Sequence, residues 1–208
     1  MNLYLVKTPN LIKTIFKDLV WSFSNLDKKL YLTFDDGPTP EITNFILAEL
    51  KKMNAKATFF CVGENVKKYP AIFQQIIDDG HSVGNHTFNH LNGWKTSTAV
   101  YLKNIEVSEK YFEGNSKLFR PPYGKITLSQ VKKLRTKGYQ IIMWDVLSGD
   151  FNKSISPEKV MNNVLNNTQN GSIIVFHDHQ KAHKNLAYCL PKILDYYSNL
   201  GFTFEKIT

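Results

Sequence analysis

The sequence predicts an α/β protein with a mostly parallel sheet, either a closed barrel or an open, doubly wound one. Short β-rich runs recur along the chain, and each is followed by a stretch with helical periodicity. The length of 208 residues favours one domain with at most a short appendage. The chain is also long enough, with 42% hydrophobic residues, to bury a sizeable core.

Seven segments have the character of strands, because they are short and rich in β-branched, aromatic and other apolar residues. They are Leu30–Phe34, Ala57–Val62, His81–Asn85, Leu118–Arg120, Tyr139–Val146, Ser172–Phe176 and Phe202–Phe204.

The segments between these strands carry helix signals. Pro40 suits the first turn of a helix, and Ile42, Phe45, Ile46 and Leu50 follow it at helical spacing. Glycines that follow apolar periodic stretches, such as Gly80, mark helix ends. The remaining predicted helices are Glu64–Asp79, Thr96–Glu113, Thr127–Lys137, one that opens at Ser156-Pro157, and Asn185–Leu200.

The first thirty residues stand outside this alternation. Thr8-Pro9 has the pattern of a cap and a first-turn proline, and the apolar residues after it share one helical face. These are Leu11, Ile12, Ile15, Phe16, Leu19 and Val20. We expect residues 1–29 to form a helical extension packed on the barrel or sheet. The alternative is a helix that contacts a membrane surface.

Composition narrows the classes of function. The net charge of +8 comes from scattered lysines, which indicates a solvated basic surface and does not by itself support nucleic-acid binding. No apolar run approaches the roughly 18 residues of a membrane-spanning helix. Cys61 and Cys189 are too few for a disulfide scaffold and are expected to be buried. Since the N-terminus lacks a secretory pattern, we expect a cytoplasmic location.

Polar residues follow five of the predicted strands. In parallel α/β folds the carboxyl ends of the strands meet on one face, where catalytic groups gather. We therefore expect the five groups to converge on one site. They are Asp35-Asp36, His86 to His90, Arg120 to Gly124, Asp145 with Asp150, and His177 to His179.

Two histidines spaced four residues apart, His86 and His90, can bind one metal, and Asp36 can supply a third ligand. Such a set leaves positions for water and substrate, but it serves zinc and non-haem iron alike. The neighbouring carboxylates Asp35 and Asp36 repel each other unless cations separate them. A metal on one and the Arg120 guanidinium on the other would do so. The Thr87 side chain either orients a metal ligand without binding the metal itself, or makes an ordinary hydrogen bond within the loop.

These motifs resemble, in order, those of NodB-type polysaccharide deacetylases, which form carbohydrate esterase family four. The resemblance covers Leu30 to the C-terminus and implies that residues 30–208 form a distorted (β/α)7 barrel. It also implies metal-dependent hydrolysis of N-acetyl groups on amino sugars, with release of acetate. It rests on Thr33-Phe34-Asp35-Asp36-Gly37, His86-Thr87-x-x-His90, Arg120-Pro121-Pro122-Tyr123-Gly124 and the apolar run ending in His177.

The resemblance assigns a role to each matching residue. Asp36, His86 and His90 would bind a divalent metal, with zinc as the expected ion. Asp35 would be the general base, kept ionised by Arg120. The backbone N–H of Tyr123 would bind the oxyanion. His177 would be the general acid, oriented by Asp150.

The fourth motif departs from the family pattern. Phe151 stands where the family commonly has Trp, and Leu147 where it has Asp or a similar residue. Phe151 is still expected to form an apolar wall for the substrate. Trp94, in a polar loop, is expected to contact substrate, whereas Trp144 is expected to pack in the core.

Two functions from other classes of protein remain consistent with the sequence. One is a glycan-binding protein on the same fold without turnover, although every expected catalytic residue is present. Another is an iron-dependent oxygenase, which the helical segments disfavour because such enzymes are usually all-β. The substrate itself stays open among N-acetylated saccharides, O-acetyl esters and lipid-linked sugars. Nothing in the sequence defines the oligomeric state.

Overall fold

The computed structural model describes residues 4–24, 26–112 and 116–208. Seven parallel strands form a curled sheet in the order β5-β4-β3-β2-β1-β7-β6, and β8 pairs with the start of β1. This confirms the α/β fold with a distorted, mostly parallel barrel. The strands are β1 (Lys29–Asp35), β2 (Ala57–Cys61), β3 (Ser82–Asn85), β4 (Leu118–Phe119), β5 (Gln140–Ile141), β6 (Val146–Leu147), β7 (Ile173–His177) and β8 (Thr203–Phe204).

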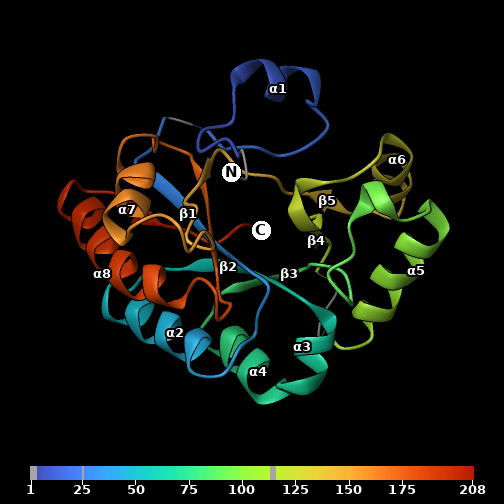
Figure 1. Cartoon of the computed structure of the whole chain (residues 1–208), viewed down its shortest axis with the longest axis horizontal. Coiled ribbons are helices and arrows are strands. Elements are labelled where there is room, and N and C mark those ends of the chain that lie inside the picture. Colours follow the sequence, from blue (N-terminus) through green and yellow to red (C-terminus); the bar gives the residue numbers. More distant parts are fainter. Residues whose placement is uncertain (1–3, 25, 113–115) are drawn as a thin grey trace.

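Helices surround the sheet on three sides, and α1 lies on the fourth, at the top of the view (Figure 1). Buried apolar side chains of the central strands pack against α2, α4, α7 and α8, so the largest core lies between strands and helices. The helices are α1 (Asn10–Ile15), α2 (Ile42–Lys52), α3 (Gly63–Lys68), α4 (Pro70–Asp78), α5 (Thr98–Glu109), α6 (Leu128–Thr136), α7 (Pro157–Leu165) and α8 (His183–Asn199).

Two predicted helices differ in extent from the observed ones. The stretch Glu64–Asp79 is two helices, α3 and α4, because Pro70 lacks an N–H and begins a new helix after the non-helical Tyr69. The stretch Thr96–Glu113 contains α5, and its last residue lies outside the described residues.

The predicted strand Tyr139–Val146 was wrong as a single element. The chain forms β5 and β6, which lie at opposite ends of the strand order, and residues 142–145 cross the gap between them. The physical reason is that the carbonyls of Ile142 and Met143 accept hydrogen bonds from the buried Arg120 guanidinium.

Residues 4–22, here called the N-terminal segment, pass over this gap. Lys7 forms an antiparallel bridge with Val146, and Val20 forms a parallel bridge with Ile142, so the segment contacts both edges of the sheet. The expected long amphipathic helix is not formed, since α1 is only six residues long. Leu11 and Ile15 point to solvent, whereas Leu19 is buried. Residues 1–3 and 25 of the expected extension lie outside the described residues.

Among the described residues, no helix has the length and apolar character needed to cross a membrane.

Candidate active site

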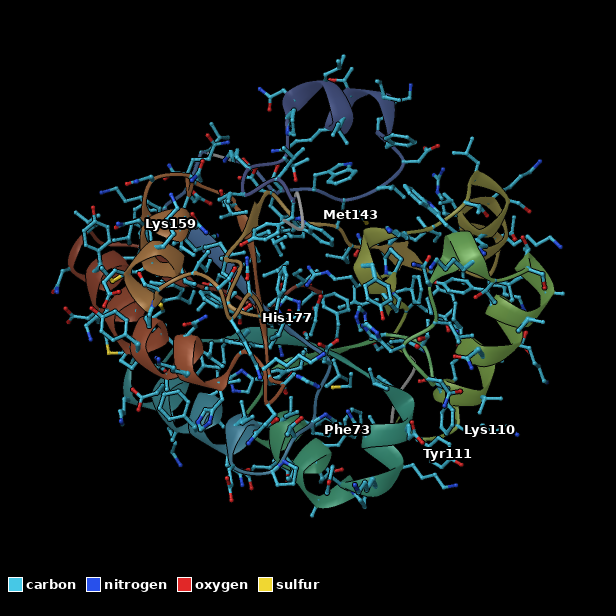
Figure 2. The ribbon with its side chains drawn as sticks, viewed as in Figure 1. Phe73, Lys110, Tyr111, Met143, Lys159 and His177 are labelled. Atoms are coloured by element: carbon cyan, nitrogen blue, oxygen red, sulfur yellow. The ribbon has the colours of Figure 1, made fainter. Side chains whose placement is uncertain are left out.

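The register of the parallel strands sets the first catalytic candidates side by side. Asp35, at the end of β1, pairs in register with His177 at the end of β7. Because parallel strands present their carboxyl ends at one edge, the loops after β1, β3 and β4 open toward the same place. His177 lies near the centre of the ring of helices (Figure 2).

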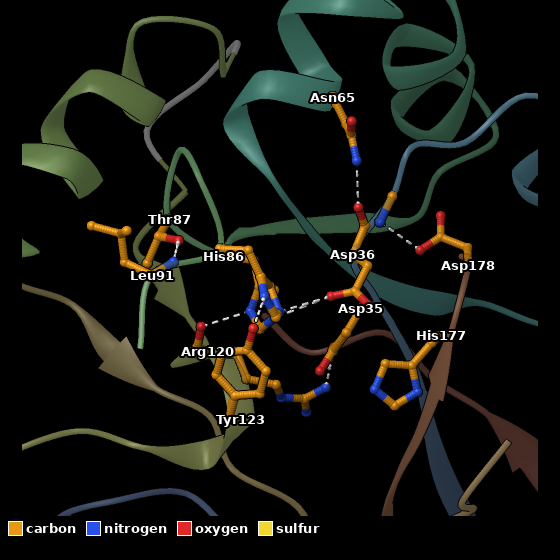
Figure 3. Close-up of polar contacts among 12 residues, drawn as sticks. Asp35, Asp36, Asn65, His86, Thr87, Leu91, Arg120, Tyr123, His177 and Asp178 are labelled. Atoms are coloured by element: carbon orange, nitrogen blue, oxygen red, sulfur yellow. Dashed lines mark hydrogen bonds and ion pairs between the residues drawn. The ribbon is translucent and has the colours of Figure 1, made fainter. Parts of the chain in front are cut away.

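Asp36, His86 and His90 form a cluster suited to a metal ion. One potential ligand atom from each lies within 4.8 Å of the others. Asp36 Oδ1 lies 3.1 Å from His90 Nε2 and 3.6 Å from His86 Nε2 (Figure 3). This oxygen is buried and has no hydrogen-bond partner among the described residues. A buried carboxylate oxygen facing two imidazole nitrogens is the environment that a divalent cation satisfies, so the residues fit such an ion.

Both histidines are oriented by contacts at Nδ1. His86 Nδ1 lies 2.8 Å from the Arg120 carbonyl oxygen, and His90 Nδ1 lies 3.0 Å from the Tyr123 hydroxyl. A hydrogen on each Nδ1 leaves the lone pair of Nε2 directed at Asp36. Burial lowers the pKa of His86 to about 4, which keeps that imidazole neutral, as a metal ligand must be.

The loops around this cluster have unusual backbone conformations. Asp36, Thr87, His90 and Tyr123 all have positive φ angles, between 55° and 86°. Residues other than glycine rarely adopt this region, and functional sites are where such strain concentrates. The Thr87 hydroxyl accepts a hydrogen bond from the Leu91 N–H, so this side chain makes a loop hydrogen bond.

Asp178 and Asn65 hold the loop that carries Asp36. Asp178 accepts hydrogen bonds from the Gly37 N–H at 2.8 Å and the Thr43 hydroxyl at 2.7 Å, and Asn65 donates to the Asp36 carbonyl. Burial raises the pKa of Asp178 to about 7. Burial would also raise the pKa of Asp36, but the nearby imidazoles of His90, His177 and His86 hold it well below its usual value.

Asp35 forms a buried ion pair with Arg120, whose NH1 lies 2.7 Å from Asp35 Oδ1. The guanidinium is fully buried and also donates to the Thr33 hydroxyl and to the carbonyls of Ile142 and Met143. Four acceptors therefore fix its position. The ion pair is joined by a short, charge-assisted hydrogen bond and lies next to the metal cluster.

His177 is held by Asp150, as the sequence predicts. One carboxylate oxygen of Asp150 lies 2.8 Å from His177 Nδ1, and the other accepts a hydrogen bond from the His177 N–H. Burial would lower the pKa of His177, but the charges of Asp150, Asp36 and Asp35 raise it to about 9. The imidazole is therefore kept protonated, which is the state required of a proton donor.

These groups line one cavity of about 900 Å³, which contains the side chains of Asp35, Asp36, His86, His90, Tyr123, Phe151 and His177. Tyr123 presents its backbone N–H without an acceptor among the described residues.

Two candidates lie elsewhere than expected, and a third makes an additional contact. Trp94 is 66% exposed and lies outside the cavity lining, with its indole N–H bonded to the Ile126 carbonyl. Trp144 packs against the core, as expected, and also lines the cavity, where it contacts Gly124. Asp145 lies away from the cluster and binds Lys7 and Lys13, because the chain there crosses the gap in the sheet.

The sequence placed Asp178 among the groups expected at the site, beside His177, but gave it no role. The N-terminal segment was not expected to line the site. For the N-terminal segment no sequence motif exists, since its residues reach the cavity only through tertiary packing.

The fold and the site together define a barrel hydrolase with a three-residue site suited to a divalent metal and a paired carboxylate and histidine beside it. The chain belongs to the polysaccharide deacetylase family, whose model matches residues 24–142. The family and the N-deacetylase class expected from the motifs are thereby confirmed, with support from the named relatives.

Curated relatives include two peptidoglycan-N-acetylglucosamine deacetylases of Bacillus cereus. One is 38% identical over 85% of this chain and 66% of its own length, so this chain spans about two thirds of that relative. The other is 33% identical over 91% of both chains. A chitooligosaccharide deacetylase of Azorhizobium caulinodans is 35% identical over 72% of this chain and 73% of its own.

Solved structures with the same fold belong to the same family. The Bc1960 peptidoglycan N-acetylglucosamine deacetylase superposes with a TM-score of 0.86 at 33% identity, over 96% of this chain and 95% of the other. BA3943 of Bacillus anthracis, described as a family-four pseudoenzyme, has a TM-score of 0.78 at 25% identity, over 90% of this chain and 66% of the other. The fold alone therefore does not guarantee activity, and the residues of the site decide.

Proposed function

We propose that this chain hydrolyses the N-acetyl group of N-acetylglucosamine units in a glycan such as peptidoglycan or a chitooligosaccharide, with zinc as its metal. The observation that carries the proposal is one cavity lined by an Arg-paired carboxylate, a three-residue metal cluster and an Asp-paired histidine. The names of the relatives support this substrate class.

Asp36, His86 and His90 would hold the metal. When bound there, zinc supplies Lewis-acid polarisation and lowers the pKa of a water molecule. Asp35 accepts the proton of the attacking water, and the hydrogen bond from Arg120 holds its carboxylate in position. The free N–H of Tyr123 donates a hydrogen bond to the oxygen that becomes negatively charged.

His177 completes the reaction as the acid. The carbon–nitrogen bond breaks, the oxygen of water remains on the acetyl carbon, and protonated His177 donates its Nε2 proton to the departing nitrogen. Asp150 fixes the ring through Nδ1, so Nε2 is the nitrogen left for donation. The products are acetate and a free amino sugar. Phe151 contacts the His177 ring edge-on, with 5.0 Å between centroids, and forms an apolar wall beside it.

The decisive experiment measures acetate release by zinc-loaded protein from N-acetylglucosamine, chitooligosaccharides, peptidoglycan fragments and O-acetylated xylan, with Asp35→Asn alongside. We expect release from N-acetylated saccharides that the variant loses. Release from the O-acetyl ester alone would contradict the N-acetyl preference. Saccharide binding without release by protein that contains zinc would identify a glycan-binding protein instead. The cytoplasmic location expected from the sequence stays a prediction, which cell fractionation tests.

A further inference from the structure

The cavity extends well beyond the catalytic residues, to a wall made by the N-terminal segment. Tyr4, Leu5, Pro9, Ile12 and Trp21 line it together with Trp144 of the segment that crosses the sheet. This part of the lining is apolar and aromatic. A volume of about 900 Å³ is far larger than an acetamide group requires, so the wall faces space that another part of a ligand can occupy.

Ion pairs and backbone hydrogen bonds hold the wall against the barrel. Lys7 and Lys13 both pair with the fully buried carboxylate of Asp145, and Lys7 Nζ lies 2.7 Å from it. The Thr8 N–H donates to the Asp145 carbonyl at 2.9 Å, and the Leu147 N–H donates to the Val6 carbonyl at 2.8 Å. Val20 exchanges backbone hydrogen bonds with Ile141 and Met143. Buried ion pairs and ladder bonds therefore set the position of the lining residues.

The wall also reaches the acid through a chain of rings. The Tyr4 ring lies 5.2 Å from the Phe151 ring, and Phe151 lies 5.0 Å from His177, centroid to centroid. Met143 lies between His177 and α1 in the view of Figure 2 and also lines the cavity. A ligand whose acetamide sits at Asp35 and His177 would thus extend directly along Tyr4 and Ile12.

Resting on the proposed function, we propose that the N-terminal segment forms a subsite for a second sugar of an N-acetylated oligosaccharide, next to the sugar that loses its acetyl group. A pyranose ring presents a face of C–H groups to an apolar surface, and Tyr4, Ile12 and Trp21 offer such a surface. Aromatic side chains give this contact large area with a polar edge for hydroxyl groups. Asp145 acts as a positioning residue, because it anchors the lysines of the wall.

The helix α1 offers a matched pair of variants. Ile12 is half-buried and lines the cavity, whereas Ile15, one turn along the same helix, is 62% exposed and lies outside the lining. Ile12→Ala and Ile15→Ala remove the same atoms from the same helix. They differ in burial and in whether the side chain faces the proposed subsite, so the free energy of unfolding of both variants is measured alongside.

The test measures kcat and KM of zinc-loaded protein for N-acetylglucosamine and its oligomers of increasing length. We expect Ile12→Ala to raise KM for the oligomers roughly tenfold with kcat and the single sugar unaffected, and Ile15→Ala to behave as the parent. An equal effect of Ile12→Ala on every length, or no difference between the two variants, would overturn the subsite while the proposed function stands. No acetate release by the parent from these oligomers or from peptidoglycan fragments would refute the proposed function, and the subsite with it.

Discussion

The Arg120 guanidinium lies 2.7 Å from Oδ1 of Asp35, a residue that lines the cavity, and the two side chains are 0% and 6% exposed. Arg120 comes from the end of β4 and Asp35 from the end of β1, so the pair also ties two separated strands together. A buried ion pair costs desolvation, and removing one partner leaves the other charge uncompensated. The pair therefore links the carboxylate proposed as the base to the stability of the barrel.

Asp35→Asn removes the proposed base without removing a proposed metal ligand. We expect turnover to fall about 10²–10⁴-fold while zinc content is retained, because general-base catalysis contributes about that much. The free energy of unfolding should fall by about 3 kcal/mol, since Arg120 loses its charge partner. Acetate release, metal analysis and urea denaturation measure the three quantities. Asp195→Asn, at an exposed position of α8, is the control. Near-normal turnover in Asp35→Asn would remove this residue from the role of base.

Asp36→Ala deletes the carboxylate that faces both imidazoles. We expect loss of zinc binding and of all acetate release, and chelation of the parent protein should have the same effect. Zinc binding to the folded parent should also stabilise it, by about 2.7 kcal/mol at a free concentration 100 times the dissociation constant. Thermal unfolding with and without zinc checks this, and a zinc-dependent shift that persists in Asp36→Ala would contradict the assignment.

Asp150→Asn should shift the alkaline limb of the pH profile to lower pH. The pKa of His177 is raised to about 9, above the ordinary value near 6.5, so the acid is protonated below that pH and is lost as pH rises through it. Removing the Asp150 charge lowers the pKa of His177. A bound cation also lowers it, so both proteins are compared at equal zinc content. An alkaline limb that does not move in the pH profile of kcat would count against His177 as the acid.

The same interaction affects stability. A histidine with a raised pKa in the folded state contributes stability that is full below the unfolded value near 6.5 and lost as pH rises toward 9. The parent should therefore lose more stability than Asp150→Asn over that interval.

Tyr123→Phe removes the hydroxyl that contacts His90 Nδ1 and leaves the backbone N–H in place. We expect zinc affinity to fall about 10–100-fold, as it does when partners behind metal-ligating histidines are removed. Competition with a chelator measures the affinity, and Tyr196→Phe, at an exposed site, controls for the loss of a phenol. Unchanged affinity would show that the hydroxyl does not orient His90.

Asp178→Ala removes the acceptor of the Gly37 N–H and the Thr43 hydroxyl. We expect a loss of about 1–3 kcal/mol in the free energy of unfolding, since buried donors are left unpaired. Asp178→Asn keeps an acceptor for Gly37 and should remain close to the parent in both stability and zinc affinity. Equal stability of the two variants would refute the anchoring role.

The sequence predicted most of the site because its residues follow the ends of strands that periodicity identifies. Asp35, Asp36, His86, His90, Arg120 and His177 all lie where the parallel register brings strand ends together. Local patterns carry that information. The division of Tyr139–Val146 into two strands could not be predicted, since it depends on a guanidinium that arrives from another strand.

Sequence patterns also could not predict toward which part of the structure a single side chain points. Trp94 stands in a polar loop and Trp144 in an apolar run, yet only Trp144 lines the cavity. The apolar stripe of the N-terminal segment predicted a longer helix, but α1 ends at Ile15. Leu19 reaches the barrel from a bend and Val20 from a β-bridge with Ile142. Tertiary hydrogen bonds with Ile141 and Met143 override the helical periodicity there.

Four residues around the metal cluster have a left-handed backbone conformation, and at these positions a more stable residue would impair function. Glycine at Asp36, Thr87, His90 or Tyr123 would relieve conformational strain, of order 1 kcal/mol or more at each position. At Asp36 and His90 it would also delete a proposed metal ligand, and at Tyr123 the hydroxyl that contacts His90. A screen that selects only for thermal stability would therefore favour glycine in these loops and yield a more stable protein without activity. Only selection on turnover would keep the strained side chains in place.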